Sequence, residues 1–215
     1  KYNKEGVIIK QIKDRSIIDE TIQVVKQYFK DPIEKYKSMK REKFHDFSLS
    51  CQNELNQLNL QRRFYESEKD LFNILVPDDE LLVESVIFLR VVLPSIFDDE
   101  INAVDFHRET FYSNDSHIPY IFNTWIPIMN VNDLNTLKYI PRSHTIPDEK
   151  IITDIDKNYP SSVKKFSSGH KMGFFWEQKR IISGVELGKV ELMHYEPYEY
   201  SLFSSMLIHG NAINN

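Results

Sequence analysis

The chain has 215 residues, of which 41% are hydrophobic, enough to bury one sizeable core. Its net charge of −5 gives no electrostatic reason to expect binding to nucleic acid or to an anionic membrane surface. The single cysteine, Cys51, excludes an internal disulfide framework and indicates a reducing, cytoplasmic setting; we expect a small buried residue there rather than a nucleophile.

The N-terminal part, residues 1–83, is expected to be mostly helical after a short strand-like piece at residues 6–13. Ser16 is the expected N-cap of the first helix, with Asp19 one turn later. Apolar residues then follow at helical spacing until Pro32, which is expected to end the run. Further helices are expected over residues 50–60 and 62–75. Their apolar faces are assigned to core packing and to no chemistry.

The most apolar run of the chain, residues 83–97, does not predict a membrane span. Arg90 and Pro94 interrupt it, and the uninterrupted part is too short to cross a bilayer. We therefore expect neither a membrane nor a nucleic acid as a partner. The sequence carries no indication of the oligomeric state.

From about residue 84 the pattern changes to short apolar or alternating runs separated by turn residues, which is typical of strands. Seven strands are expected, over residues 84–94, 101–107, 119–131, 137–141, 171–177, 189–196 and 200–210. They predict a mainly β fold, an antiparallel sandwich or barrel with the helices beside it. The polar, poorly periodic stretch 145–170 is expected to be a long loop.

A His-x-Glu triplet occurs twice, at His107/Glu109 and at His194/Glu196. Average composition predicts about one such triplet by chance, so the triplet alone decides nothing. His107 is expected at the end of a strand, where residues i and i+2 point to the same face. His107 and Glu109 can therefore converge while Arg108 points away, and an imidazole with a carboxylate suits a divalent metal such as Fe(II).

The expected third ligand is His209, at the end of the run over residues 200–210. One face of this run is expected to carry Ser201, Phe203, Ser205, Leu207 and His209. Gly210 follows and permits a tight turn. Because the intervening strands can fold back, His107 and His209 can meet at one mouth of the barrel.

The remaining histidines are weaker ligand candidates. His194 is followed closely by Pro197 and is separated from His209 by the length of one hairpin, so we expect His194 and Glu196 to be ordinary strand-end residues. His45 and His170 lie in polar segments and are expected to be solvated. His144 is expected to be a buried, hydrogen-bonded residue that supports a turn.

Three stretches, in this order, carry a resemblance to a known family: HRETFY, NTWIPIMNVNDLNTLKYIPRSHT and LIHGNAINN. They resemble the phytanoyl-CoA dioxygenase-like group of Fe(II)/2-oxoglutarate oxygenases, which has a His-x-Asp/Glu pair, a Trp-containing strand, a Pro-x-Ser-His segment and a distal His-Gly. The matching positions are His107/Glu109, Trp125, residues 141–144 and residues 209–210.

The resemblance covers residues 84–215 and implies a double-stranded β-helix, a cupin-like jelly roll of two sheets with helices outside it. The whole chain, residues 1–215, is then expected to be a single oxygenase domain, with residues 1–83 as its helical part. The family has eight core strands, one more than the seven expected here. The last strand is therefore expected in a segment that follows Asn215.

The resemblance implies an enzyme in which His107, Glu109 and His209 bind Fe(II), with 2-oxoglutarate and O2 as co-substrates. The implied reaction is hydroxylation of a C–H bond of a small polar metabolite, with release of succinate and CO2. Glu109 stands where aspartate is commoner in the family. Because it keeps a carboxylate ligand, it favours hydroxylation over the halogenation that some relatives without this ligand perform.

Further residues have implied roles in binding. Asn123 and Trp125 share one strand face and are expected to line the co-substrate pocket, with core packing as the alternative for Trp125. Asn211 matches a polar family position that contacts the co-substrate, with a turn residue as the alternative. Tyr112 and His117 are candidate substrate contacts.

In the family, an arginine beyond the distal histidine binds the far carboxylate of 2-oxoglutarate. We expect this arginine in the segment after Asn215, with Lys138 and Arg90 as alternatives. Two other functions stay open. One is a cupin-like metal-dependent isomerase or hydrolase that needs no 2-oxoglutarate, and the other is a non-catalytic jelly roll that binds a small molecule.

Overall fold

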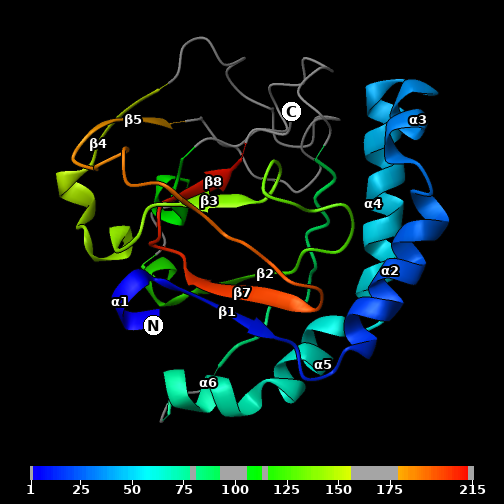
Figure 1. Cartoon of the computed structure of the whole chain (residues 1–215), viewed down its shortest axis with the longest axis horizontal. Helices are drawn as coiled ribbons and strands as arrows, with labels where there is room; N and C mark the ends of the chain where they lie inside the picture. Colours follow the sequence, from blue (N-terminus) through cyan, green and yellow to red (C-terminus); the bar gives the residue numbers. More distant parts are fainter. Residues whose placement is uncertain (1, 78–80, 93–105, 113–115, 156–178, 213–215) are drawn as a thin grey trace. The chain divides into compact units, whose positions relative to one another are not determined.

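The computed structural model describes residues 2–77, 81–92, 106–112, 116–155 and 179–212. The chain divides into two compact units (Figure 1), one formed by residues 11–91 and the other by residues 1–10 together with residues 92–215. The described part of the first unit is helical, and the second contains the sheets. The single oxygenase domain expected from the sequence stays a prediction.

The helical unit confirms the expected character of the N-terminal part. Its helices are α2 (Ser16–Tyr28), α3 (Pro32–Lys37), α4 (Arg41–Gln57), α5 (Leu60–Ser67) and α6 (Lys69–Leu75). Ser16 is the first helical residue rather than the N-cap, and its backbone N–H donates to the carboxylate of Asp14 at 3.0 Å. Pro32 begins α3 instead of ending α2, because a proline is tolerated in the first turn of a helix. No helix among the described residues is long and apolar enough to cross a membrane.

Cys51 lies in the core of the helical unit. Its side chain is wholly buried, and Leu55, one turn later on α4, is buried as well. Burial raises the pKa of the Cys51 thiol to about 11, so the thiol is protonated at neutral pH. The expectation of a small buried residue at this position is confirmed.

The strand expected over residues 84–94 is wrong for its described part, because residues 84–92 form no strand. Their backbone is bonded to side chains of α4 instead. The N–H of Ile87 donates to Asn56 Oδ1 at 2.6 Å, and the N–H of Leu89 donates to Gln52 Oε1 at 3.0 Å. Two backbone N–H groups of this apolar run are thus satisfied without a partner strand.

The second unit begins with α1 (Tyr2–Glu5) and β1 (Val7–Gln11), and β1 confirms the strand-like piece expected at residues 6–13. One three-stranded sheet has the order β1-β7-β2, with β7 (Glu199–Ser204) paired antiparallel to β2 (Phe122–Trp125). A second has the order β6-β3-β8, in which β3 (Leu137–Tyr139) pairs antiparallel with both β6 (Glu191–Leu192) and β8 (His209–Asn211).

These two sheets pack against each other (Figure 1). Leu137 and Tyr139 of β3 share one hydrophobic cluster with Val7 of β1 and Phe203 of β7. The expected presence of both helices and antiparallel sheets is confirmed. The described strands form separate open sheets and do not close into a barrel.

The run over residues 200–210 is two strands, not the single strand expected. A turn separates β7 from β8. The N–H of Leu207 donates to the carbonyl of Ser204 at 2.9 Å, and the N–H of Met206 donates to the hydroxyl of the same serine at 3.1 Å. The predicted alternation from Ser201 to His209 is therefore broken, because a serine hydroxyl can bond its own local backbone and so stabilise a turn.

The other expected strands are shorter or lie elsewhere. The run over residues 119–131 contains only β2, preceded by the 3₁₀ turn η4 (Ile118–Tyr120). The runs over residues 137–141 and 189–196 contain β3 and β6. Residues 101–105 and 171–177 lie outside the described residues.

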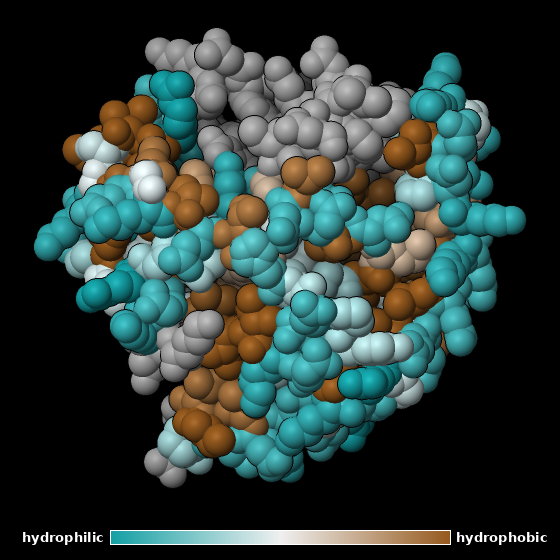
Figure 2. Space-filling model, viewed as in Figure 1, coloured by the Kyte–Doolittle hydropathy of each residue, from teal (hydrophilic) through white to brown (hydrophobic). Residues whose placement is uncertain are grey.

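The expected long loop at residues 145–170 contains regular structure in its described part. The 3₁₀ turns η5 (Ser143–Thr145) and η6 (Asp148–Lys150) lead into β4 (Ile152–Ile155), which pairs antiparallel with β5 (Lys179–Ser183). Apolar side chains lie at the surface over this hairpin (Figure 2); those exposed are Ile152, Ile155 and Ile182. Ile181 is buried and joins a second hydrophobic cluster with Ile151 and Ile208.

Candidate metal centre

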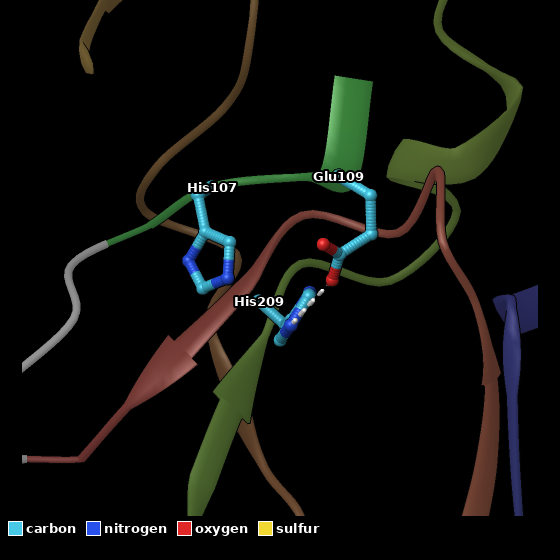
Figure 3. A group of neighbouring side chains, drawn as sticks. All are labelled: His107, Glu109 and His209. Carbon is cyan, nitrogen blue, oxygen red and sulfur yellow. Dashed lines mark ion pairs between the residues drawn. The ribbon is translucent and has the colours of Figure 1, made fainter. Parts of the chain in front are cut away.

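His107, Glu109 and His209 lie together in the sheet-containing unit. One nitrogen of each imidazole and one carboxylate oxygen lie within 4.8 Å of one another. Nε2 of His209 is 4.0 Å from Oε1 of Glu109, and the two imidazole ring centroids are 4.3 Å apart. Figure 3 shows the three side chains pointing toward one another from two separate segments of the chain. Among the described residues, no other group of three or more His, Cys, Asp and Glu side chains is close enough to hold a metal ion.

A β-bridge brings the two histidines together. The N–H of His107 donates to the carbonyl of His209, and the N–H of His209 donates to the carbonyl of His107, both at 2.9 Å. Residues directly opposite each other in an antiparallel pair have their side chains on the same face. The bridge therefore fixes both imidazoles on one side, as the sequence predicted.

Glu109 reaches the site from a 3₁₀ turn. Arg108 is extended, with φ −132° and ψ 162°, and Glu109 begins η3 (Glu109–Phe111). The extended residue keeps His107 and Glu109 on one side, as the i, i+2 argument requires. The N–H of Glu109 donates to the carbonyl of Ser205 at 3.0 Å, so the turn between β7 and β8 holds the backbone of this ligand.

The protonation of His209 suits metal binding. Its Nδ1 lies 2.9 Å from the carbonyl oxygen of Leu207. A carbonyl can only accept, so Nδ1 carries the proton and Nε2 keeps a lone pair directed toward Glu109. Burial lowers the pKa of His209, although the nearby Glu109 carboxylate acts in the opposite direction. The imidazole is therefore neutral at neutral pH, which is the form that binds metals.

The donor set fits a first-row divalent ion. Two imidazoles with one carboxylate form the facial set that suits Fe(II). Ligands at about 2.1 Å from a common ion and at right angles to each other lie about 3 Å apart. If the side chains rotated so that each ligand atom moved by about 1 Å, all three atoms could reach a common ion. The three residues could thus hold a metal without rearrangement of the backbone.

Asn123 orients the Glu109 carboxylate. Its Nδ2 donates to Oε1 of Glu109 at 2.9 Å. Asn123 lies on β2 opposite Phe203 of β7, and the Phe203 ring contacts the His209 imidazole edge-on at 4.7 Å between centroids. The β2–β7 pair therefore supports two of the three candidate ligands. The sequence-based role of Asn123 in binding a co-substrate stays a prediction.

Replacing Asn123 with alanine is expected to weaken metal binding about 10-fold to 100-fold, because a partner that fixes a ligating carboxylate contributes that much to metal affinity. The measurement is isothermal titration of the protein with Co(II). Asn123→Asp is the comparison variant, since it keeps the volume but places a second carboxylate against Glu109. Unchanged Co(II) affinity in Asn123→Ala would mean that Glu109 needs no such support.

Trp125 lies on β2, the strand that carries Asn123, and Asn211 lies on β8, the strand that begins with His209. The Trp125 ring is 5.1 Å from the Tyr195 ring and packs against the cluster between the sheets. This contact favours the core-packing role for Trp125. Asn211 faces Leu137 in the β8–β3 register, two positions beyond His209 and therefore on the same face of the sheet. A co-substrate role for both residues stays a prediction.

The two candidate substrate contacts differ in position. The Tyr112 ring lies 5.2 Å from the His107 ring, measured between centroids, and Tyr112 directly follows η3. His117 is exposed, and its carbonyl accepts the N–H of Tyr120 at the start of η4. Tyr112 therefore borders the candidate metal centre, whereas the carbonyl of His117 supports the η4 turn.

Lys138 and Arg90 are the two alternative cations for the far carboxylate of 2-oxoglutarate. Tyr139 is opposite His209 in the β3–β8 register, and Lys138 is opposite Gly210, so the Lys138 side chain leaves the sheet on the face away from His209. There its Nζ lies 4.2 Å from the centroid of the Phe106 ring. Arg90 belongs to the helical unit. The register thus separates Lys138 from the candidate metal centre.

The second His-x-Glu triplet has a different environment. Nδ1 of His194 lies 2.7 Å from a carboxylate oxygen of Asp133, and both side chains are exposed. Glu196 is exposed too, and its N–H donates to the Glu199 carboxylate at 2.8 Å. His194 and Glu196 were expected to be ordinary strand-end residues, and they lie just beyond the end of β6 at Leu192. His144 lies in η5, as expected for a turn residue, but is half-buried; His170 lies outside the described residues, as does the side chain of His45.

Two residues next to the candidate ligands were not singled out by the sequence. Arg108 and Ser143 are wholly buried, and both are hydrogen-bonded close to the site. The sequence offered one indication for Arg108. It stands between His107 and Glu109, and if those two side chains point to one face, the Arg108 side chain must point to the other.

No protein-family model matches the chain, and no curated protein matches it.

Proposed function

We propose that this chain is an Fe(II)/2-oxoglutarate-dependent oxygenase that hydroxylates a C–H bond of a small polar metabolite. We further propose that its facing antiparallel sheets belong to a double-stranded β-helix. The observation that carries the proposal is the convergence of His107, Glu109 and His209, two imidazoles and one carboxylate from distant segments of the chain. Such a set leaves three coordination positions open for a co-substrate and O2.

The chain's own residues would hold and orient the ion. His209 would bind through Nε2, because Nδ1 donates to the Leu207 carbonyl. Glu109 would bind through a carboxylate that Asn123 orients. When bound, Fe(II) supplies O2 activation coupled to oxidative decarboxylation of 2-oxoglutarate to succinate and CO2. The packed core beside the site would limit access of water to it.

Phe203 gives the site an apolar wall. Its ring meets the His209 imidazole edge-on, and it is buried in the cluster between the sheets. An apolar wall strengthens the electrostatic contacts of the neighbouring charged ligands because it lowers the local dielectric constant. The same wall favours a neutral imidazole at His209.

A second candidate function is a metal-dependent isomerase or hydrolase that needs no 2-oxoglutarate. One observation favours it. Lys138, the cation on the strand that pairs with β8, leaves the sheet on the face away from His209. It is therefore not positioned to pair with the far carboxylate of a co-substrate bound at the candidate metal centre.

The two functions differ in a spectroscopic experiment. Anaerobic addition of Fe(II) and 2-oxoglutarate is expected to produce a weak visible charge-transfer absorption, and admission of O2 is expected to release succinate. Both are expected to persist in His194→Ala, which removes an exposed histidine outside the site. Both are expected to be lost in His107→Ala.

Metal binding without the absorption and without succinate would reject the oxygenase and leave the isomerase or hydrolase. A protein that binds no divalent ion at any loading would reject both. In that case the non-catalytic binding module would be the remaining candidate.

A further inference from the structure

We propose that Ser143 and Arg108 form a buried clamp that sets the spacing between the two halves of the metal centre. One half is the segment His107–Glu109, and the other is the segment that ends at His209. Neither clamp residue is a ligand; both are positioning residues. The proposal rests on the metal binding included in the proposed function, but not on the use of 2-oxoglutarate.

The first arm of the clamp is the Arg108 side chain. Its Nη2 donates to the carbonyl of Ser143 at 2.9 Å, and its Nη1 donates to the carbonyl of Ile146 and to Oδ1 of Asp148, both at 2.8 Å. The guanidinium is planar and its donors have a fixed geometry, so three acceptors define its orientation. Because Arg108 is extended between two candidate ligands, fixing its side chain also fixes the direction in which His107 and Glu109 point.

The second arm is the Ser143 hydroxyl. It accepts the backbone N–H of Ile208 at 2.7 Å, one residue before His209. The adjacent backbone supports this arm, because the N–H of Ile140 donates to the carbonyl of Ile208 at 2.9 Å. Ser143 therefore bonds one half of the site through its carbonyl and the other through its hydroxyl. All three residues of this connection, Arg108, Ser143 and Ile208, are wholly buried.

A contribution to folding stability does not by itself explain why a buried arginine occupies position 108. Taking a guanidinium out of water costs free energy, and an apolar side chain of similar volume is often as stable or more stable in such a position. Nε of Arg108 is buried and has no hydrogen-bond partner, which adds to that cost. What the arginine supplies, and an apolar residue would not, is a directional connection from the candidate ligand pair to Ser143.

The experiment compares Ser143→Ala with a matched control, Thr136→Val. Thr136 is also buried in the same unit, and its hydroxyl donates to the carbonyl of Met193 at 2.6 Å. This hydroxyl, the group that the substitution removes, bonds neither ligand segment. Each variant loses one buried hydroxyl bond. We measure Co(II) affinity and visible Co(II) absorption by titration, and hydrogen exchange of the Ile208 amide in the metal-free protein.

Ser143→Ala is expected to lower Co(II) affinity about 10-fold to 100-fold, the range known for residues that orient ligands, and to speed exchange at Ile208. Thr136→Val is expected to change the affinity less than about 3-fold, because it acts on stability alone. Should Ser143→Ala fail to fold, Asp148→Ala takes its place, because Asp148 is half-exposed and its carboxylate accepts hydrogen bonds from Arg108 and from the Thr110 hydroxyl beside Glu109. Its Co(II) affinity is expected to fall as well.

Equal Co(II) affinity of the wild type and Ser143→Ala would overturn the clamp proposal. An equal loss of Co(II) affinity in Thr136→Val would overturn it too. Failure of the oxygenase proposal looks different. Wild type would then bind Co(II) normally and show no 2-oxoglutarate-dependent absorption with Fe(II), while the clamp variant would still bind Co(II) more weakly. Wild type that binds no Co(II) would overturn both.

Discussion

Replacing His209 with alanine is expected to lower the affinity for Fe(II) or Co(II) by more than about 100-fold, beyond the effect of removing a residue that only orients a ligand. The reason is that His209 is the most buried of the three candidate ligands, and its Nε2 is already directed toward Glu109. Two remaining ligands leave the ion mostly hydrated. Anaerobic isothermal titration with each metal measures the effect.

Two comparisons separate a ligand from a structural histidine. His194→Ala removes the histidine of the other His-x-Glu triplet, which is exposed and bonded to Asp133, and it should leave the affinity unchanged. Circular dichroism of His209→Ala tests whether the variant still folds. A folded His209→Ala protein with wild-type affinity would remove His209 from the site and, with it, the observation on which the proposed function rests.

Replacing Gly184 with alanine is expected to destabilise the sheet-containing unit by about 3 kcal/mol, from backbone strain and overpacking together. Gly184 directly follows β5 and has φ +91°, a conformation that L-residues rarely adopt. A Cβ at this position would overlap the carbonyl oxygen of Lys150 and lie 3.1 Å from Cα of Ile151. Both obstacles are backbone atoms, so no side-chain rotation relieves them.

Gly188→Ala is the matched control for Gly184→Ala, because a Cβ there would meet nothing within 4 Å and its φ is not positive. It should change the unfolding free energy by less than about 0.5 kcal/mol, as for an ordinary surface substitution. Urea unfolding followed by circular dichroism measures both. Equal stability of the two variants would show that the end of the β4–β5 hairpin tolerates movement of Lys150.

The sequence-based predictions of the fold were best where one local pattern decides the structure. The helical spacing before Pro32 predicted α2, and the apolar run at residues 137–141 contains β3. Predictions failed where contacts with a distant segment of the chain decide the local structure. Residues 84–92 have strand-like composition, but the amide groups of Asn56 and Gln52 take up their backbone bonds. Propensity cannot anticipate an acceptor that folding brings from another segment.

For the candidate site, the sequence by itself determined which residues had the chemistry to bind a metal. His107 and Glu109 were selected by donor type, by the i, i+2 spacing across Arg108 and by their place in the stretches that resemble a known family. His209 was selected by its place at the end of the last of these stretches, and the structure brings all three together. Donor type belongs to the side chain, and the spacing acts between neighbours. Both can therefore be read without knowing what lies across the sheet.

Only the tertiary structure decided the surroundings of those ligands. It split the run at residues 200–210 into β7 and β8, bonded Asn123 to Glu109, and turned Lys138 away from His209. It also joined Ser143 to both halves of the site. Each outcome depends on strand register and on contacts between distant segments, and a shift of register by one residue would reverse which side chains face the site.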